Sequence, residues 1–181
     1  MDVTSEDAQK KVNFRNVFVI HGRNLKIRNA MFSFLRSLDL KPIEWEEARK
    51  ATGKPSPYIG EILRAGFSMA QAFIVLFTGD DEARLIKDFQ SENDAEHEKN
   101  MTPQPRMNVI LEAGMALALY PERTIIVELG RIRPMSDLSG LYSVRLDNDA
   151  PSRQILVGRL QDAGCEFETF GTDWLKIGDF S

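Results

Sequence analysis

Short, continuous apolar runs separated by segments with helical periodicity are the feature that most constrains the fold of this chain. Three runs of β-branched and aromatic residues, at 16–20, 72–77 and 124–128, are typical of strands buried on both faces. From Asn24 to Leu38 the apolar residues recur at three- and four-residue spacing, which predicts a helix with one buried face. Strands that alternate with single helices predict a parallel sheet with helices on both faces and right-handed crossovers.

Weaker patterns complete this alternation, and single helices continue to separate the strands. They predict a strand at 41–45 that ends at Trp45, a polar loop at 46–56, a helix from Pro57 to about Ser68, an acid-rich polar region at 79–102, a strand near 142–146 and a helix at 152–163.

Composition places the chain among ordinary globular domains. Its 181 residues suit one domain, with 43% hydrophobic and 28% charged residues. A net charge of -4 argues against nucleic acid as a partner. Cys165 is the only cysteine, and neither a signal peptide nor a membrane-spanning run is evident, so we expect a cytoplasmic location.

The segment 105–119 predicts a nearly all-apolar helix that contains one acid, Glu112. Its apolar character predicts a helix covered on most sides, with Pro105 outside it. We expect the helix to start about three residues before Glu112, so that the acid lies in the first turn. Burial there would raise the pKa of Glu112, whereas the helix dipole would lower it. The carboxylate either completes the cap of its own helix or serves as an active-site acid. The second interpretation is favoured because cleft carboxylates are enriched at functional sites.

The predicted sheet tells where a ligand should bind. In open parallel sheets, ligands lie beyond the carboxyl ends of the strands, where the strand order reverses. Residues 21–24, 46–56 and 78–81 each follow a predicted strand, and the start of the Glu112 helix faces the same edge. We therefore expect these loops to converge around Glu112.

Several familiar chemistries do not fit. Residues 66–70 look like part of a nucleophile elbow, but their serine ends a helix instead of following a strand. Residues 53–56 lack the spacing of a phosphate-binding loop, and no dinucleotide fingerprint follows the first strand. His21 and Arg23 stand where a phospho-receiver domain needs acids. His97 lies among acids without a second firm ligand, so we expect a solvated loop and no metal site.

Several sequence blocks occur in one order along the chain: FVIHGR at 18–23, WEEA at 45–48, PYIGE at 57–61, FTGDD at 77–81, QPRMNVILEAGM at 104–115, RTIIVE at 123–128, SDLSG at 136–140 and TDWLK at 172–176. Together they resemble the bacterial TIR-like nucleotide-binding domains, relatives of the Toll/interleukin-1 receptor domain, over about residues 16–180. The resemblance implies a flavodoxin-like, three-layer α/β domain over 14–181, with residues 1–13 as an N-terminal extension.

The resemblance also implies a function. Many prokaryotic members cleave NAD at the nicotinamide glycosidic bond and act in antiphage defence, often fused to a STING-like cyclic-dinucleotide sensor or to membrane segments. We therefore expect an NAD+ glycohydrolase that self-associates, with NAD+ as substrate, no cofactor, and a cyclic-nucleotide sensor as a possible activator. The alternative is a non-catalytic TIR module that binds nucleotide or other TIR domains as a scaffold.

By this resemblance Glu112 corresponds to the catalytic glutamate of the family. A fixed carboxylate can stabilise the positive charge that develops on the ribose as nicotinamide leaves. Asn108 lies four residues earlier, so the two side chains would share one helix face and grip the ribose together. Asn108 is equally well explained as the N-cap of the helix.

The remaining site residues are predicted from their positions after strands. Arg23 is expected to pair with the pyrophosphate, although an ordinary surface arginine fits this position as well. Trp45 either stacks on nicotinamide or adenine or packs as an ordinary aromatic at the end of its strand. Asp80 and Asp81 are expected to meet ribose hydroxyls, although they can equally start a turn. In the family, the loop at 46–56 commonly contacts a neighbouring protomer and helps to complete the site.

Overall fold

A parallel sheet forms the centre of the molecule. The structure, a computed structural model, describes residues 13–136, 140 and 142–181, so most of the proposed N-terminal extension and most of the SDLSG block lie outside it. The strand order is β2-β1-β3-β6-β7, and every pairing is parallel. These strands are β1 (Asn13–Ile20), β2 (Lys41–Ile43), β3 (Ala70–Phe77), β6 (Thr124–Glu128) and β7 (Val144–Arg145).

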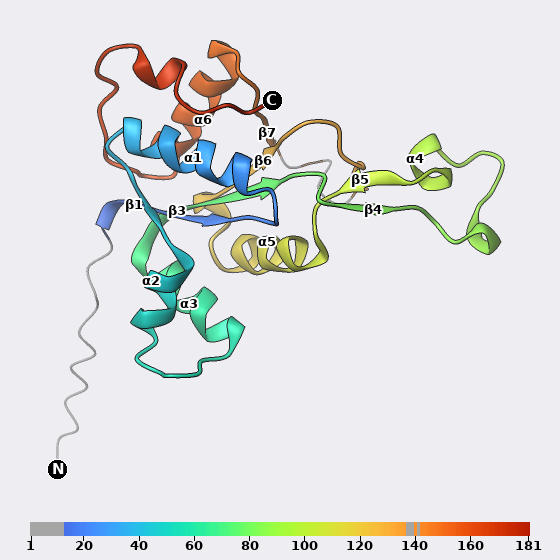
Figure 1. Cartoon of the computed structure of the whole chain (residues 1–181), viewed down its shortest axis with the longest axis horizontal. Coiled ribbons are helices and arrows are strands. Elements are labelled where there is room, and N and C mark those ends of the chain that lie inside the picture. The colour runs from blue at the N-terminus through green and yellow to red at the C-terminus, as the bar shows by residue number, and fades with distance from the viewer. Residues whose placement is uncertain (1–12, 137–139, 141) are drawn as a thin grey trace.

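Helices cover both faces of this sheet, which confirms the predicted three-layer, flavodoxin-like class (Figure 1). Side chains of β1 alternate between two apolar cores, with Val17 and Val19 in one and Phe18 and Ile20 in the other. The first core is closed by α1 (Leu25–Ser37) and α6 (Ala150–Asp162), and the second by α2 (Trp45–Ala51), α3 (Ile59–Met69) and α5 (Met107–Leu119).

The segment after β2 differs from the prediction. Trp45 does not end a strand but begins α2, and the expected loop at 46–56 is helical as far as Ala51. The charges that suggested a loop stabilise this helix instead, because Arg49 Nε donates to Glu46 Oε2 at 2.8 Å within one turn. Ala48 is fully buried on the inner side of α2.

Of the expected loop, only residues 52–56 are irregular. Pro57 does not enter the next helix, which begins after Tyr58. The backbone N–H of Tyr58 donates to Glu61 Oε2 at 3.0 Å, half of a capping box. The last two predicted elements also differ slightly from the structure. The last strand, β7, covers only Val144–Arg145, and α6 already begins at Ala150.

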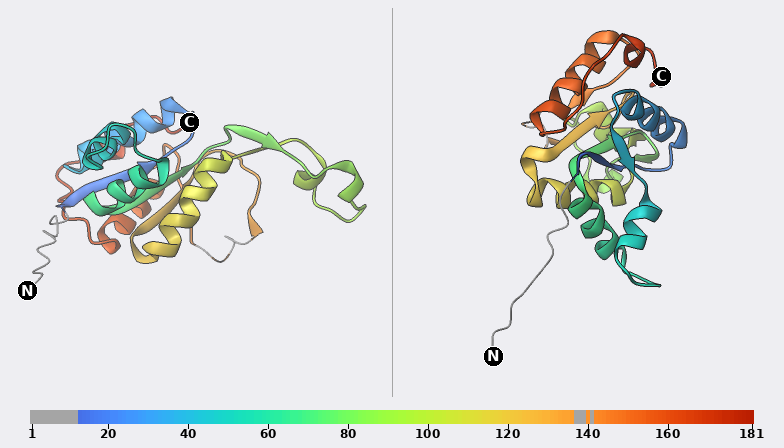
Figure 2. Two further views of the ribbon diagram at one scale, coloured as in Figure 1. Left: turned by 90° about the horizontal axis from the view of Figure 1, so that it is seen from below. Right: turned by 90° about the vertical axis from the view of Figure 1, so that its left-hand side faces the viewer.

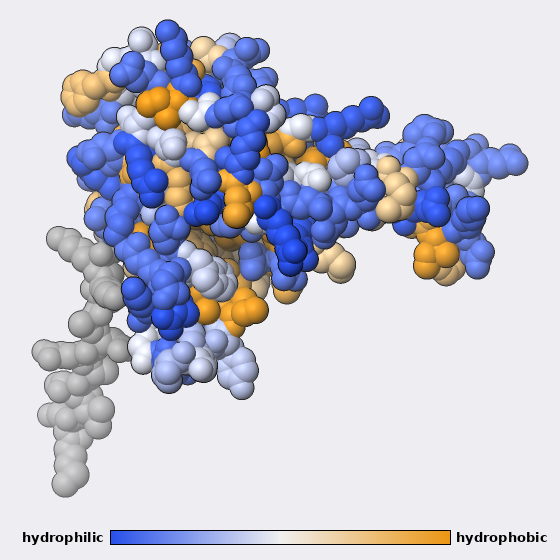
Figure 3. Space-filling view, viewed as in Figure 1, coloured by the Kyte–Doolittle hydropathy of each residue, from blue (hydrophilic) through white to orange (hydrophobic). Residues whose placement is uncertain are grey.

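The acid-rich region at 79–102 is not a simple loop but an arm that projects from the sheet (Figure 2). Its strands β4 (Asp81–Ala83) and β5 (Thr102–Gln104) pair antiparallel, and beyond them lie the 3-10 turn η1 (Lys87–Phe89) and helix α4 (Glu96–Lys99). Apolar side chains are exposed near the outer end of this arm (Figure 3); they are Ile86 and Phe89.

Helix α5 is less covered than its composition predicts. It buries only small or medium side chains, those of Val109, Ala113 and Ala116. On its other side Met107 is 74% and Leu111 is 67% exposed. The expectation of a helix covered on most sides was therefore wrong, because the sheet and its neighbours contact one narrow face of α5.

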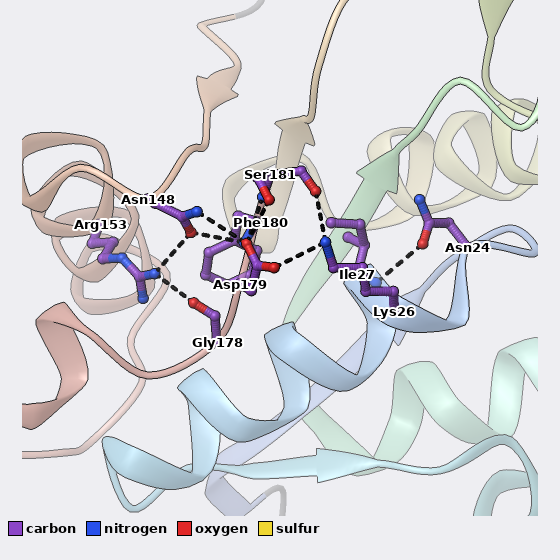
Figure 4. A network of polar contacts seen from close by, with 9 residues as sticks. All are labelled: Asn24, Lys26, Ile27, Asn148, Arg153, Gly178, Asp179, Phe180 and Ser181. Carbon is purple, nitrogen blue, oxygen red and sulfur yellow. Dashed lines mark hydrogen bonds and ion pairs between the residues drawn. The ribbon is translucent and has the colours of Figure 1, made fainter.

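The C-terminal segment seals the layer of α1 and α6 (Figure 4). Arg153 of α6 is almost fully buried and donates to the carbonyl oxygens of Ile177 and Gly178. Asp179 pairs with Lys26 at the start of α1, with 2.9 Å between Oδ2 and Nζ. These contacts fasten the segment after the 3-10 turn η4 (Asp173–Leu175) to both helices.

Candidate active site

A cleft of about 280 Å³ opens at the carboxyl ends of β1 and β2. Because Phe18 lies opposite Ile43 in the parallel register, the residues that follow these strands emerge at the same edge of the sheet. Helix α1 contributes to the cleft from one face of the sheet, and α3 and α5 contribute from the other. The lining residues are Phe18, Val19, Ile20, His21, Arg28, Phe32, Ile43, Glu44, Trp45, Leu63 and Glu112.

Glu112 reaches this cleft from α5, as the sequence predicts, but from a different turn. The helix begins at Met107 after the cap residue Arg106, so Glu112 lies in the second turn, away from the free amides of the helix start. Among the described residues, the side-chain carboxyl of Glu112 forms neither a hydrogen bond nor an ion pair. Burial raises the pKa of Glu112 to about 7. The interpretation as a helix cap is therefore excluded, and the group is a desolvated carboxyl that faces a cavity.

Trp45 lies where the prediction placed it, although for a different structural reason. As the first residue of α2 it stands beside the end of β2 and lines the cleft. Its side chain is 41% exposed, so one part of the indole packs while the rest remains available to a flat ligand.

Three polar residues of the cleft were not predicted as site residues. His21 and Glu44 directly follow β1 and β2, so the rule that ligands bind at strand ends identifies both positions. Arg28 carried no such signal, because it lies within α1 beside the apolar face that the periodicity marks.

The geometry of His21 fixes its chemical state. Its Nδ1 lies 2.8 Å from the carbonyl oxygen of Gly22, which only accepts, so Nδ1 carries the hydrogen and Nε2 is the acceptor. Burial is the main cause that lowers the pKa of His21, and the nearby charge of Arg28 acts in the same direction. The ring is therefore neutral near pH 7 and contributes a neutral acceptor.

A family model described as CAP12/Pycsar effector protein, TIR domain, matches residues 16–148. This match spans the sheet from β1 to β7 and every residue that lines the cleft. The chain belongs to this family. It is therefore a TIR domain of bacterial antiphage-defence effectors, which confirms the resemblance found in the sequence blocks. A comparison with curated proteins found no match.

In this TIR domain, Asp80 and Arg23 are joined to each other and not to the cleft. Asp80 Oδ2 accepts from the backbone N–H of Arg23 at 2.5 Å and from that of Asn24 at 3.4 Å. Gly22 permits this approach, since a Cβ at that position would lie 1.9 Å from the same oxygen. The carboxylate thus holds the loop after β1, and the prediction that it meets a ribose hydroxyl loses its support.

Asp81 and Asn108 also lie outside the set of cleft-lining residues. Asp81 begins β4 at the base of the arm, where its Oδ2 is 3.7 Å from Arg106 Nε. Asn108 is exposed at the second position of α5 and does not cap the helix, because the cap is Arg106. Of the predicted site residues, the fold therefore brings together Glu112 and Trp45 but leaves Arg23, Asp80, Asp81 and Asn108 elsewhere.

Two exclusions can be compared with the structure. Ser68 lies in the last turn of α3 and donates to the carbonyl oxygen of Ala65 at 2.8 Å, so it does end a helix. Within the described part of the chain, no three side chains of His, Cys, Asp or Glu gather as a metal site requires. Nor does that part contain a helix long and apolar enough to cross a bilayer.

Proposed function

We propose that this TIR domain is an NAD+ glycohydrolase that cleaves the bond between nicotinamide and ribose. The observation that carries the proposal is the carboxyl of Glu112, which is half-buried in a cleft at the strand ends and has no cationic partner among the residues that the structure describes. Keeping a desolvated carboxylate is costly for stability, and such groups are concentrated at functional sites.

The reaction needs little more than a well-placed negative charge. The C–N glycosidic bond breaks, and its electron pair leaves with nicotinamide, which departs as a neutral molecule from a cationic ring. The ribose carbon then carries the positive charge as an oxocarbenium ion, which the carboxylate of Glu112 stabilises. Water adds to that carbon and loses a proton, and ADP-ribose results. With a pKa raised to about 7, Glu112 is also suited to accept that proton.

A cationic substrate matches the electrostatics of the cleft. Burial disfavours the charged form of Glu112 in the empty protein, and a pyridinium ring beside it would favour that form again. The attraction therefore operates on the oxidised dinucleotide, whose nicotinamide ring is positive, and not on the neutral ring of NADH. Trp45 at the cleft can stack on a flat ring, as the sequence analysis expected.

The size of the cleft limits what it holds. A volume of about 280 Å³ is at the lower end of ligand pockets, which suits one end of a dinucleotide better than the whole. The nicotinamide riboside part fits inside, and the remainder lies across the open edge. A neighbouring protomer at that edge would complete the site, which agrees with assembly-dependent activation.

Self-association is the second part of the proposal. The exposed apolar side of α5 and the exposed segment 52–58 are the surfaces that support it, because isolated domains seldom leave such helix faces uncovered. An activating partner that senses a cyclic nucleotide would then act by promoting assembly. Contacts of the head-to-tail kind build open strands.

The test is the release of nicotinamide from NAD+ by concentrated protein, compared with Glu112→Gln. The substitution keeps the shape of the side chain and removes the charge, so turnover should fall about a hundredfold or more. Glu122→Gln, at an exposed glutamate outside the cleft, is the matched control and should keep normal turnover. NADH should not be cleaved. Near-normal turnover of a folded Glu112→Gln protein would refute the assignment.

The alternative is a non-catalytic module that binds nucleotide or other TIR domains as a scaffold. The exposed side of α5 favours this function as well, because association alone would explain it. The two differ in the assembled state: a scaffold would assemble at high concentration and release no nicotinamide.

A further inference from the structure

Arg28 lines the cleft from the side opposite Glu112. It belongs to the second turn of α1, on one face of the sheet, whereas Glu112 comes from α5 on the other. Its side chain is 24% exposed, so the guanidinium is largely withdrawn from solvent. The guanidinium group is a cation that offers five N–H donors.

The donors of Arg28 are poorly used within the protein. Its Nε is buried and has no hydrogen-bond partner among the described residues. Its Nη1 lies 3.5 Å from Glu44 Oε2, which is long for a charge-assisted hydrogen bond. The guanidinium carbon lies 5.1 Å from the centre of the Phe32 ring, which supports the side chain but uses no donor.

Glu44 does not fully neutralise the charge of Arg28, because a second arginine shares its carboxylate. Its other oxygen, Oε1, lies 3.6 Å from Arg36 Nη2. Two arginines therefore meet one carboxylate, and this side of the cleft keeps an excess of positive charge while Glu112 lies across from it. The cleft is bipolar, with a cation at one wall and a carboxyl at the other.

From this arrangement we propose that Arg28 binds a phosphate oxygen of the substrate, beside the ribose that Glu112 contacts. The inference rests on the proposed function and names the residue that recognises the anionic part of NAD+. The planar guanidinium suits phosphate oxygens, and the unused donors give it the capacity to bind them. When a phosphate binds Arg28 in place of Glu44, the carboxylate of Glu44 can remain paired with Arg36.

The same observations move this role away from Arg23, where the sequence analysis had placed it. Arg23 is exposed, it is not among the lining residues of the cleft, and its backbone is held by Asp80. A phosphate next to the ribose lies only a few bonds from the carbon at which cleavage occurs. The cation that binds it must therefore line the cleft itself, as Arg28 does.

The experiment compares Arg28→Gln with Arg36→Gln. The control is closely matched, because Arg36 lies on the same helix, pairs with the same Glu44 and also contacts Phe32, at 5.5 Å, but does not line the cleft. Nicotinamide release is measured from NAD+, nicotinamide mononucleotide and nicotinamide riboside, the last of which has no phosphate. Arg28→Gln should raise KM for the first two about tenfold or more and leave the riboside unchanged, whereas Arg36→Gln should have a much smaller effect, because it removes no group that lines the cleft.

Two outcomes would overturn the proposal. An equal loss on the riboside would make Arg28 a structural residue, and unchanged KM values would remove it from substrate binding. Arg28→Lys, which keeps the charge but not the fork, should recover part of the affinity for NAD+. Thermal melting of each variant shows whether the fold is intact.

A binding measurement separates this inference from the proposed reaction. Calorimetry with ADP-ribose and with inorganic pyrophosphate on the full chain reports anion binding without turnover. If the native protein releases no nicotinamide, the proposed reaction fails, but weaker binding of ADP-ribose to Arg28→Gln than to Arg36→Gln would still support the anion site. Equal binding by the two variants would refute it, whatever the turnover.

Discussion

The two helical layers of this TIR domain differ in how completely other parts of the chain cover them. The layer of α1 and α6 is sealed by the C-terminal segment, whose carbonyl groups are satisfied by the buried Arg153. The layer of α3 and α5 leaves Met107 and Leu111 in solvent. The cleft opens between the layers, and the half-buried carboxyl of Glu112 enters it from the layer of α3 and α5. The C-terminal segment of the chain therefore closes one layer, whereas the other keeps exposed surfaces that a substrate or a second protomer would cover.

The largest expected effect tests the sealed layer. Arg153→Met should lower the free energy of unfolding by about 3 kcal/mol, because it removes hydrogen bonds from a buried cation to backbone carbonyls. The guanidinium also lies 4.8 Å from the ring of Phe180, a contact that would be lost. Urea denaturation measures the change. Arg145→Met is the control, since that side chain is 89% exposed and should stay within about 0.5 kcal/mol of the native protein. Equal effects of the two substitutions would show that the C-terminal segment does not fasten this layer.

The next effect tests the open layer. Met107→Gln and Leu111→Gln should each weaken self-association about tenfold, a typical loss for an apolar interface residue, and leave the melting temperature nearly unchanged. Ile155→Gln is the control, because Ile155 is an exposed apolar residue of α6 on the sealed layer. Light scattering and specific turnover are followed together over a wide range of protein concentration.

The outcome separates two kinds of site. If activity depends on assembly, the native protein should gain specific turnover with concentration, and the α5 variants should need more protein for the same gain. Constant specific turnover by a protein that stays monomeric would show that each chain carries a complete site. The open layer would then have another role.

The sequence predicted those elements whose burial is nearly complete. Strands β1 and β3 are recognisable because both of their faces are covered, which makes the apolar runs continuous. Glu112 was identified because an acid is conspicuous in an apolar helix. The prediction that Glu112 lies in the first turn was wrong, because α5 starts at Met107. The carboxyl is therefore farther from the positive end of the helix dipole than expected.

The failures lie where local pattern and tertiary contact disagree. The charges of helix α2 suggest a solvated loop, but Glu46 pairs with Arg49 within the helix and Glu47 pairs with Lys41 of β2. Ala48 is buried on the inner side of the same helix. The strands of the arm, β4 and β5, have three residues each, too few to show an alternating pattern. The sequence carries no signal for Arg28, because the role proposed for it depends on contacts with Glu44 and Phe32 that form only in the fold.

The smallest expected effect is the loss in the free energy of unfolding when Glu112, in the layer of α3 and α5, becomes ionised. Its pKa of about 7 in the folded protein exceeds the ordinary glutamate value of 4.5, so between these pH values the folded state holds a proton that the unfolded state has lost. The free energy of unfolding of the native protein should therefore fall as pH rises from about 4.5 to 7. Glu112→Gln lacks this dependence and should gain on the order of 1 kcal/mol relative to the native protein at pH 8, after allowance for solvent screening.

The same titration governs catalysis with the opposite sign. In the proposed reaction the ionised carboxyl stabilises the oxocarbenium ion, so kcat/KM of the native protein should rise with pH through about 7 and then level off. Urea unfolding of both proteins at pH 5 and pH 8, with turnover of the native protein across that range, measures both trends. If Glu112→Gln gains no stability between these pH values while kcat/KM stays flat, Glu112 is ionised throughout. Its carboxyl would then be no more costly to keep than one on the surface, and the contrast between the layers would rest on α5 alone.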